Sequence, residues 1–204
     1  MAESRDEDMT ADLVTADLVT ADLVTADLVA ADLVAADLVA ADLRRMLDEN
    51  AILGLMARFD DAILRRDKAA MQALWAPEGV WEIGQFNPDG SKHITPLRAQ
   101  GMDQILAAQQ QFNDLNEFFF RTTLRAVITL DGDRAAATAP STEFARRKDG
   151  HGYSNVALYE DALERRDGAW VFASRKYFYL WVDSVSPIPG GDAVPLPPSL
   201  REPA

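Results

Sequence analysis

A tandem repeat of five residues is the feature that most constrains how this chain can fold. Residues 11–45 read ADLVT, ADLVT, ADLVT, ADLVA, ADLVA, ADLVA and ADLRR. This period matches neither the alternation of a strand nor the periodicity of an α-helix. On a helix each repeat advances by about 500°, so the Leu-Val pairs spiral round the whole surface and form no single stripe. The repeat therefore divides the chain into a low-complexity leader, residues 1–45, and an ordinary globular region.

The leader also resembles the A(D/N)LXX consensus of pentapeptide-repeat proteins. That resemblance implies a square β-helix with four pentapeptides in each coil. Seven units give fewer than two coils, whereas solenoids need several stacked units to bury a core. We consider three interpretations, in this order: a frayed or helical tail, a short β-helix, and a binding device.

The charge and composition of the chain restrict its partners and its location. The net charge is -13, and residues 1–45 contain eleven acidic and three basic residues, so the leader carries -8 and the remainder -5. This balance argues against nucleic acid or an anionic membrane as a partner. No segment reaches about 20 uninterrupted apolar residues, and the acidic N-terminus is unlike a signal peptide, so we expect a cytoplasmic protein. Because cysteine is absent, disulfides and thiolate nucleophiles are excluded.

Residues 46–185 are expected to form a single α+β domain, followed by a proline-rich, extended tail, residues 186–204. Asp48 and Asp67 are suitable N-caps for two helices, and a third helix is predicted over residues 102–112. Helices followed by long hairpins predict a curved antiparallel sheet that wraps around the helices as a cone with an interior pocket. The predicted strands cover residues 80–86, 91–97, 118–130, 135–147, 153–164 and 170–182.

Four segments in this order resemble the SnoaL-like branch of the nuclear transport factor 2-like superfamily. They read AILGLMARFDDAILRRDKAAMQALW, GVWEIG, LDGDRAAA and LERRDGAWVFASRKYF, within residues 48–182. The resemblance implies a cone-shaped fold and a homodimer or homotrimer. It also implies cofactor-independent chemistry, because the family includes dehydrochlorinases and dehydratases in which an Asp on the first helix and a His on the sheet abstract a proton.

The sequence departs from that family at the positions of the proton-abstracting pair. By this resemblance Leu64 occupies the position of the family Asp, and Arg121, or a neighbouring residue if the strand carries a gap, occupies that of the family His. Phe59 stands where many relatives carry a catalytic tyrosine, and phenylalanine donates no hydrogen bond. Any catalysis must therefore use other groups.

Asp60 is the first candidate for such a group. Five residues share one face of the first helix of the domain: Met56, Phe59, Asp60, Ile63 and Leu64. A carboxylate within this apolar stripe needs a cation, hydrogen bonds or protonation, because an unpaired buried charge is costly. Two interpretations of Asp60 remain open: a general base or acid in the cavity, or a structural salt bridge at the edge of the stripe.

Arg121 is the predicted partner of Asp60. Phe119, Arg121 and Thr123 alternate to one face of their strand. A guanidinium there would hold Asp60 ionised or stabilise an oxyanion such as an enolate or phenolate. The alternative is an arginine on the outer surface of the sheet.

The remaining pocket candidates come from strand alternation and from the family resemblance. Arg175 shares a strand face with Tyr177, Tyr179 and Trp181, and the resemblance places its position in the pocket. Plain core packing is the alternative for every aromatic residue. The full set of predicted substrate-binding residues is Phe59, Ile63, Leu64, Trp81, Phe119, Asn155, Tyr159 and Arg175.

His93 would replace the missing family base if it faced inward from the second short strand, whereas a surface or structural role is the alternative. No cluster of His and carboxylates has the spacing of metal ligands, and no glycine-rich loop suits a phosphate or a dinucleotide. We therefore expect neither a metal nor a cofactor.

These observations predict a lyase or isomerase that abstracts a proton from an apolar cyclic or aromatic substrate, with Asp60, Arg121 and His93 as catalytic candidates. The reaction would be an elimination, a dehydration, an isomerisation or a carbon-carbon cleavage. The alternative is a non-catalytic module of the same fold that binds a small molecule or serves as a partner subunit.

Overall fold

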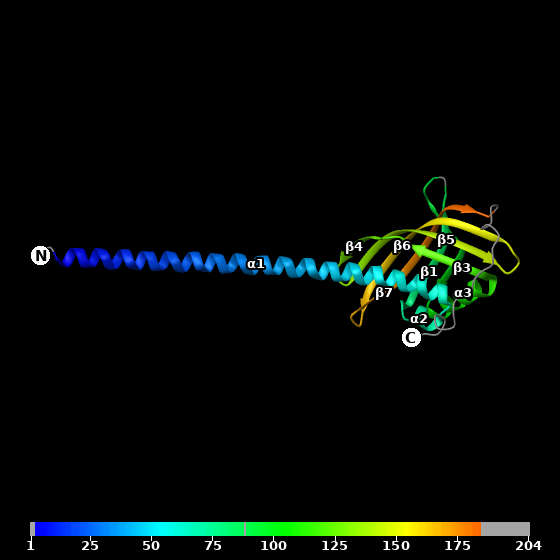
Figure 1. Cartoon of the computed structure of the whole chain (residues 1–204), viewed down its shortest axis with the longest axis horizontal. Coiled ribbons are helices and arrows are strands. Elements are labelled where there is room, and N and C mark those ends of the chain that lie inside the picture. Colours follow the sequence, from blue (N-terminus) through cyan, green and yellow to red (C-terminus); the bar gives the residue numbers. More distant parts are fainter. Residues whose placement is uncertain (1–2, 88, 185–204) are drawn as a thin grey trace. The chain divides into compact units, whose positions relative to one another are not determined.

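A computed structural model describes residues 3–87 and 89–184 (Figure 1). The chain divides into two compact units, residues 1–47 and 48–204. Helix α1 spans Glu3–Arg65, so the repeat is α-helical, the first of the three interpretations, and not a β-helix. In the part of the repeat whose side chains the structure describes, residues 32–45, the large apolar side chains are exposed: Leu33 is 63% exposed and Val39 68%. The proline-rich tail, residues 186–204, lies outside the described residues.

Within the second unit, α1 presents an apolar face that is fully or almost fully buried. Ile52, Leu55, Met56 and Phe59 follow the helical spacing that the sequence predicts and are at most 2% exposed. Asp48 is not an N-cap, because α1 continues through it. Its carboxylate instead accepts hydrogen bonds from Arg165 at 2.6 Å and from the indole nitrogen of Trp170 at 3.1 Å.

The end of α1 leads directly into a short second helix. Arg66 has a positive φ of 60°, and the backbone N–H of Asp67 donates to the carbonyl of Ala62 at 2.9 Å, an arrangement typical of helix C-termini. The side chain of Asp67 then accepts a hydrogen bond from the N–H of Ala70 and caps α2, Lys68–Gln72. The predicted cap is confirmed, and a strand begins at Trp75, soon after α2 ends.

The strands of the second unit form one curved sheet, visible as the long bent arrows of Figure 1. The strand order is β2-β1-β7-β6-β5-β3, and β4 pairs with β5. Only β1 and β7 pair in parallel among the strand pairs of the described residues. The elements are β1 Trp75–Phe86, β2 Lys92–Gln100, α3 Met102–Leu115, β3 Asn116–Thr123, β4 Val127–Asp131, β5 Arg134–Arg147, β6 Gly152–Arg166 and β7 Ala169–Asp183.

This arrangement confirms the predicted α+β fold with its curved sheet. One strand differs from the prediction: the chain between residues 118 and 130 is divided into β3 and β4 by an interruption at residues 124–126. Arg125 lies within that interruption and is exposed.

Irregularities in the pairing of β6 with β7 decide which side chains of β7 face inward. The register shifts between Ala162 and Leu163 and again between Val156 and Ala157. Trp181 was expected on the face of Arg175, but it lies beyond the second shift and is 53% exposed. A bulge reverses the side-chain alternation of a strand, so this prediction for Trp181 is wrong.

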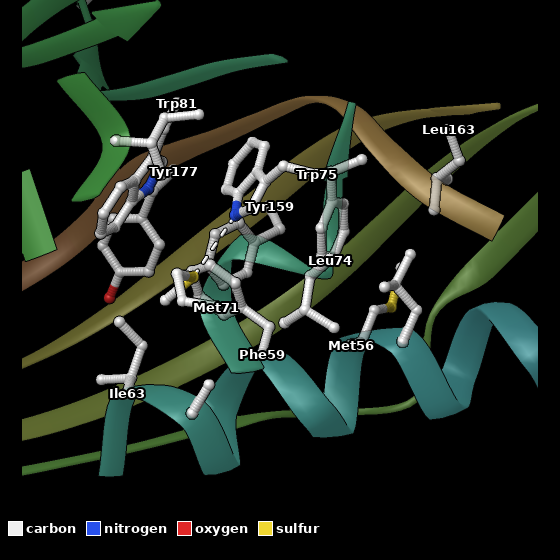
Figure 2. Packing of buried hydrophobic residues seen from close by; sticks show 14 of the residues in the cluster. Met56, Phe59, Ile63, Met71, Leu74, Trp75, Trp81, Tyr159, Leu163 and Tyr177 are labelled. Atoms are coloured by element: carbon white, nitrogen blue, oxygen red, sulfur yellow. Dashed lines mark hydrogen bonds between the residues drawn. The ribbon is translucent and has the colours of Figure 1, made fainter. Parts of the chain in front are cut away.

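The core is rich in aromatic rings and centres on Phe59. Figure 2 shows this ring rising from α1 toward the sheet, among side chains of α2, β1, β6 and β7. Its centroid lies 5.8 Å from those of Trp81 and Phe172, and 6.4 Å from that of Tyr159, all with edge-to-face geometry. The charged groups described next lie against these same rings.

Candidate functional site

Two cross-strand rows of buried polar side chains lie on the inner face of the sheet. In the first row, Arg121 of β3 faces Glu143 of β5, which faces Asn155 of β6. In the second row, Asp161 of β6 faces Arg175 of β7. The four ionisable side chains of these rows are at most 5% exposed. Burial of so many charges is costly unless they are paired, so these rows define the candidate site.

Arg121 and Glu143 form a tightly hydrogen-bonded pair. The Nε and Nη2 atoms of Arg121 donate to one carboxylate oxygen of Glu143 at 2.9 and 2.6 Å. Asn155 donates to the other oxygen at 3.3 Å and accepts a hydrogen bond from the hydroxyl of Tyr177. The predicted partner of Arg121 was Asp60, but the register of β3 and β5 sets Glu143 directly opposite the arginine.

Arg175 and Asp161 form a looser pair. Arg175 Nε lies 3.7 Å from Asp161 Oδ1, which exceeds hydrogen-bond distance. The guanidinium carbon lies 3.7 Å from the ring centroid of Tyr159 and 4.3 Å from that of Phe59. Stacking on aromatic faces stabilises a buried guanidinium without consuming its N–H groups. This cation is therefore held mainly by rings, and its carboxylate neighbour is not fixed by hydrogen bonds.

Asp60 is half-buried and held by a single residue of β3. Its Oδ2 accepts the backbone N–H of Thr123 at 2.7 Å, and its Oδ1 lies 3.2 Å from the Thr123 hydroxyl. The same hydroxyl accepts a hydrogen bond from Arg175 Nη2 at 3.3 Å. Thr123 thus connects the carboxylate of Asp60 to the second row, so Asp60 belongs to the cluster although it contacts neither arginine by a hydrogen bond that the structure shows.

Burial sets the protonation of the cluster. It raises the pKa of Asp161 to about 7, with the positive charge of Arg175 opposing the rise and the negative charge of Asp60 adding to it. Burial also raises the pKa of Tyr159 well above its ordinary value. Burial disfavours the charged form of Arg121, but the negative charge of Glu143 helps to hold its pKa well above the ordinary value. At neutral pH Arg121 is therefore charged, Tyr159 is a neutral donor, and Asp161 is poised to gain or lose a proton.

Several buried polar atoms of the cluster have no hydrogen-bond partner among the described residues. Buried polar atoms are nearly always hydrogen-bonded, so a concentration of exceptions indicates groups that a small ligand or water engages. The donors and acceptors fit a molecule that carries oxygen atoms. They are Nη1 of Arg121, Nε and Nη1 of Arg175, the hydroxyl of Tyr159, both carboxylate oxygens of Asp161 and Nε1 of Trp81.

The other predicted site residues fall into two groups. Ile63 and Trp81 are buried in the aromatic core, Phe119 packs against it, and Leu64 is half-buried. His93 lies on β2 and is exposed, so the inward orientation on which its catalytic role depended is wrong. Short edge strands carry weak alternation signals, and the sequence alone did not fix the direction of this side chain.

Glu143 and Asp161 were missed by sequence reasoning, although the signal was present. Asp161 stands two residues after Tyr159, and the period of a strand places both on one face. Glu143 continues an inward series of small residues along β5, in which every second residue from Ala135 to Ala145 is buried. The signal that identifies both groups is thus a carboxylate at a position that the alternation of its strand assigns to the buried face.

The described residues contain no group of three or more His, Cys, Asp or Glu side chains placed to hold a metal ion. No helix in the described part of the chain is both long enough and apolar enough to cross a membrane.

Comparisons with known proteins agree on the fold. The SnoaL-like domain family matches residues 44–176, whereas none of the curated proteins matches the sequence. Among solved structures, hexachlorocyclohexane dehydrochlorinase LinA-type3 from Novosphingobium barchaimii LL02 is similar with a TM-score of 0.60 at 17% identity, covering 76% of this chain and 99% of that one.

Two further similar structures come from Novosphingobium aromaticivorans. A putative scytalone dehydratase has a TM-score of 0.59 at 14% identity, covering 72% of this chain and 97% of that one. The beta subunit of a putative aromatic-ring-hydroxylating dioxygenase has a TM-score of 0.57 at 19% identity, covering 66% and 90%. At these identities the structural likeness establishes the cone-shaped fold alone.

Proposed function

The chain belongs to the SnoaL-like domain family, and from this premise we propose that it is a cofactor-independent lyase or isomerase. Its substrate is a small, apolar cyclic or aromatic molecule, from which it abstracts a proton. The observation that carries the proposal is the half-buried carboxylate of Asp60, which lies in one electrostatic cluster with Arg121, Tyr159 and Asp161.

Asp60 is the general base in this proposal. A base must be held in one orientation so that it reaches the proton it removes, and the two hydrogen bonds from Thr123 provide that orientation. The side chain is also less buried than the other carboxylates of the cluster, Glu143 and Asp161, and is thus the easiest for a substrate to approach.

Arg121 and Arg175 stabilise the negative charge that develops when the proton leaves. Each keeps an Nη1 group without a partner among the described residues, and such preorganised donors stabilise an enolate or phenolate oxygen most strongly inside a buried site. The rings of Phe59 and Tyr159 lie under these guanidiniums and suit a flat, apolar substrate.

Proton NMR in deuterated water tests this function. The purified protein is mixed with a panel of phenols, cyclic ketones and hydroxylated aromatic compounds, and loss of an activated C–H signal is followed. We expect exchange by the wild type, an at least about 100-fold slower exchange by Asp60→Asn, and no change in Asp61→Asn. Asp61 is the matched control because it is exposed and pairs with Arg65 on the helix surface. Equal exchange by wild type and Asp60→Asn contradicts the proposal.

A second candidate function is a non-catalytic module that binds a small molecule or serves as a partner subunit. It is favoured by the exposed positions of His93 and His151, which leave the site without a histidine, and by Glu143, which occupies much of the hydrogen-bonding capacity of Arg121. Line broadening of a ligand without any exchange in the NMR experiment supports this alternative.

For either function we propose a homodimer or homotrimer, which analytical ultracentrifugation tests.

A further inference from the structure

We propose that Asp161 is a second catalytic residue, which delivers a proton to an oxygen atom of the substrate while Asp60 removes a proton from carbon. This inference rests on the proposed function and specifies its substrate class. The substrate carries a hydroxyl group on the carbon next to the one that loses its proton, and that hydroxyl departs as water.

The geometry of Asp161 differs from that of a structural ion pair. Its side chain is fully buried, its distance to Arg175 is beyond hydrogen-bond range, and both of its oxygens lack a partner among the described residues. Its neighbour on β5 is Ala137, whose side chain has no hydrogen-bonding group. A carboxyl group whose oxygens are both unengaged in a polar cluster is free to hold a proton and to present it to a ligand.

The surroundings of Asp161 favour a protonated carboxyl near neutral pH. The charged groups that act on it are Arg175 on β7 and Asp60 on α1. Burial outweighs the attraction of the arginine and raises the pKa to about 7, so the acid form and the base form are both populated. Asp60, by contrast, is less buried and accepts hydrogen bonds from Thr123. Two carboxyl groups in such different environments form a natural acid–base pair.

The proposed reaction balances without a co-reactant. Asp60 takes the proton from carbon, and the electron pair of the C–H bond forms the new double bond. The neighbouring carbon–oxygen bond breaks as Asp161 gives its proton to the departing oxygen, which leaves as water. Asp60 then releases its proton to solvent and Asp161 takes one up, so the net change is loss of one water from the substrate.

A pair of probes separates the two roles. The aryl β-hydroxy ketone formed from benzaldehyde and acetone loses water, and its β-chloro analogue loses chloride; both give the same enone, which is followed by absorbance. Departing hydroxide needs a proton whereas chloride does not. We expect Asp161→Asn to slow the loss of water at least about 100-fold and the loss of chloride less than about threefold. Asp60→Asn is expected to slow both reactions strongly.

The outcomes distinguish this inference from the function on which it rests. If Asp161→Asn slows both probes equally, or neither, Asp161 is not the proton donor, while the role of Asp60 is unaffected. If Asp60→Asn slows neither, the proposed function itself fails.

A measurement on the ligand-free protein tests the protonation of Asp161 independently of turnover. Carboxyl carbon NMR of the wild type, assigned by comparison with Asp161→Asn, follows the titration of this group. We expect a transition near neutral pH, and a carboxylate that stays ionised down to about pH 5 overturns the inference.

Discussion

Each of the two buried ion pairs of the sheet joins an arginine to a carboxylate, but the two carboxylates differ in the number of hydrogen bonds that they accept. In the pair of Arg121 with Glu143, both partners are 2% exposed and the carboxylate accepts three hydrogen bonds from the arginine and Asn155. In the pair of Arg175 with Asp161, both side chains are fully buried and the carboxylate accepts no hydrogen bond from the described residues. The arginine of the second pair lies instead against Tyr159 and Phe59.

This difference indicates that burial alone does not decide whether a charged side chain is structural or takes part in binding and catalysis. A pair whose carboxylate is hydrogen-bonded through both oxygens has little acceptor capacity left for a ligand, and removing one partner leaves an uncompensated charge. A pair with unused donors and acceptors keeps the capacity to bind a substrate and to exchange a proton. We therefore regard the pair of Arg121 with Glu143 as mainly structural, with Nη1 of Arg121 left for a ligand, and the second pair as the part of the cluster most open to chemistry.

The largest effect is expected from neutralising the structural pair. Glu143→Gln removes the negative charge opposite Arg121 and should lower the free energy of unfolding by about 3 to 5 kcal/mol, because a buried guanidinium is left uncompensated. Urea denaturation at neutral pH measures this change. A loss below about 1 kcal/mol would mean that the pair behaves like a solvent-exposed one.

A smaller effect with a distinctive pH dependence is expected at the second pair. The folded protein binds a proton at Asp161 up to a pKa of about 7, whereas the unfolded chain loses it near 3.8. Wild type therefore loses stability as the pH rises between these values, and Asp161→Asn, which has no proton to lose there, does not.

We expect the stability of Asp161→Asn relative to wild type to increase by about 2 to 3 kcal/mol between about pH 5 and pH 8. Paired urea titrations at the two pH values give this difference. The exposed Asp61→Asn provides the baseline, and an unchanged difference between wild type and Asp161→Asn would show that Asp161 is ionised across the whole range.

The aromatic support of Arg175 is tested by Arg175→Lys, which keeps the charge but loses the planar group that stacks on Tyr159. We expect a loss of about 1 to 2 kcal/mol in the free energy of unfolding. The same change at Arg121 should cost more, because it also breaks hydrogen bonds to Glu143. Equal losses at the two positions would contradict the contrast between a stacked and a hydrogen-bonded arginine.

The smallest effect is expected from Tyr177→Phe, which removes the hydroxyl that donates to Asn155. The ring packing is retained, so the loss should be about 1 kcal/mol, the typical net value of one hydrogen bond. Thermal unfolding monitored by circular dichroism detects a shift of this size. No shift would mean that Asn155 orients Glu143 without help from this hydroxyl.

Much of the fold could be predicted from the sequence, because helices and their caps depend on local patterns of residues. The helical spacing of Met56, Phe59 and Ile63 predicted the buried face of α1, and Asp67 was identified as a cap from its position before α2. Asp48 was misassigned, because a cap residue at a helix start and an acidic residue within a continuous helix look alike until the preceding segment is known to be helical.

Only part of the site could be predicted from the sequence. Strand alternation together with the family resemblance predicted pocket positions for Arg121, Tyr159 and Arg175, and the helical stripe predicted Asp60 near them. The same alternation carried the information for Glu143 and Asp161, but the identity of each ion pair depends on register. One residue of slip changes every cross-strand neighbour, and no local pattern fixed the register of β5 or β6.

The sequence by itself determined the periodicities: a repeat of five that forms no single apolar stripe on a helix, and alternations that direct charged side chains into the sheet interior. The tertiary structure decided which charges meet. Arg121 faces Glu143 and Arg175 faces Asp161 because strands distant in the chain pair in one register. Periodicity is a property of neighbouring residues, whereas pairing, burial and the pKa of Asp161 arise only when distant strands exclude water together.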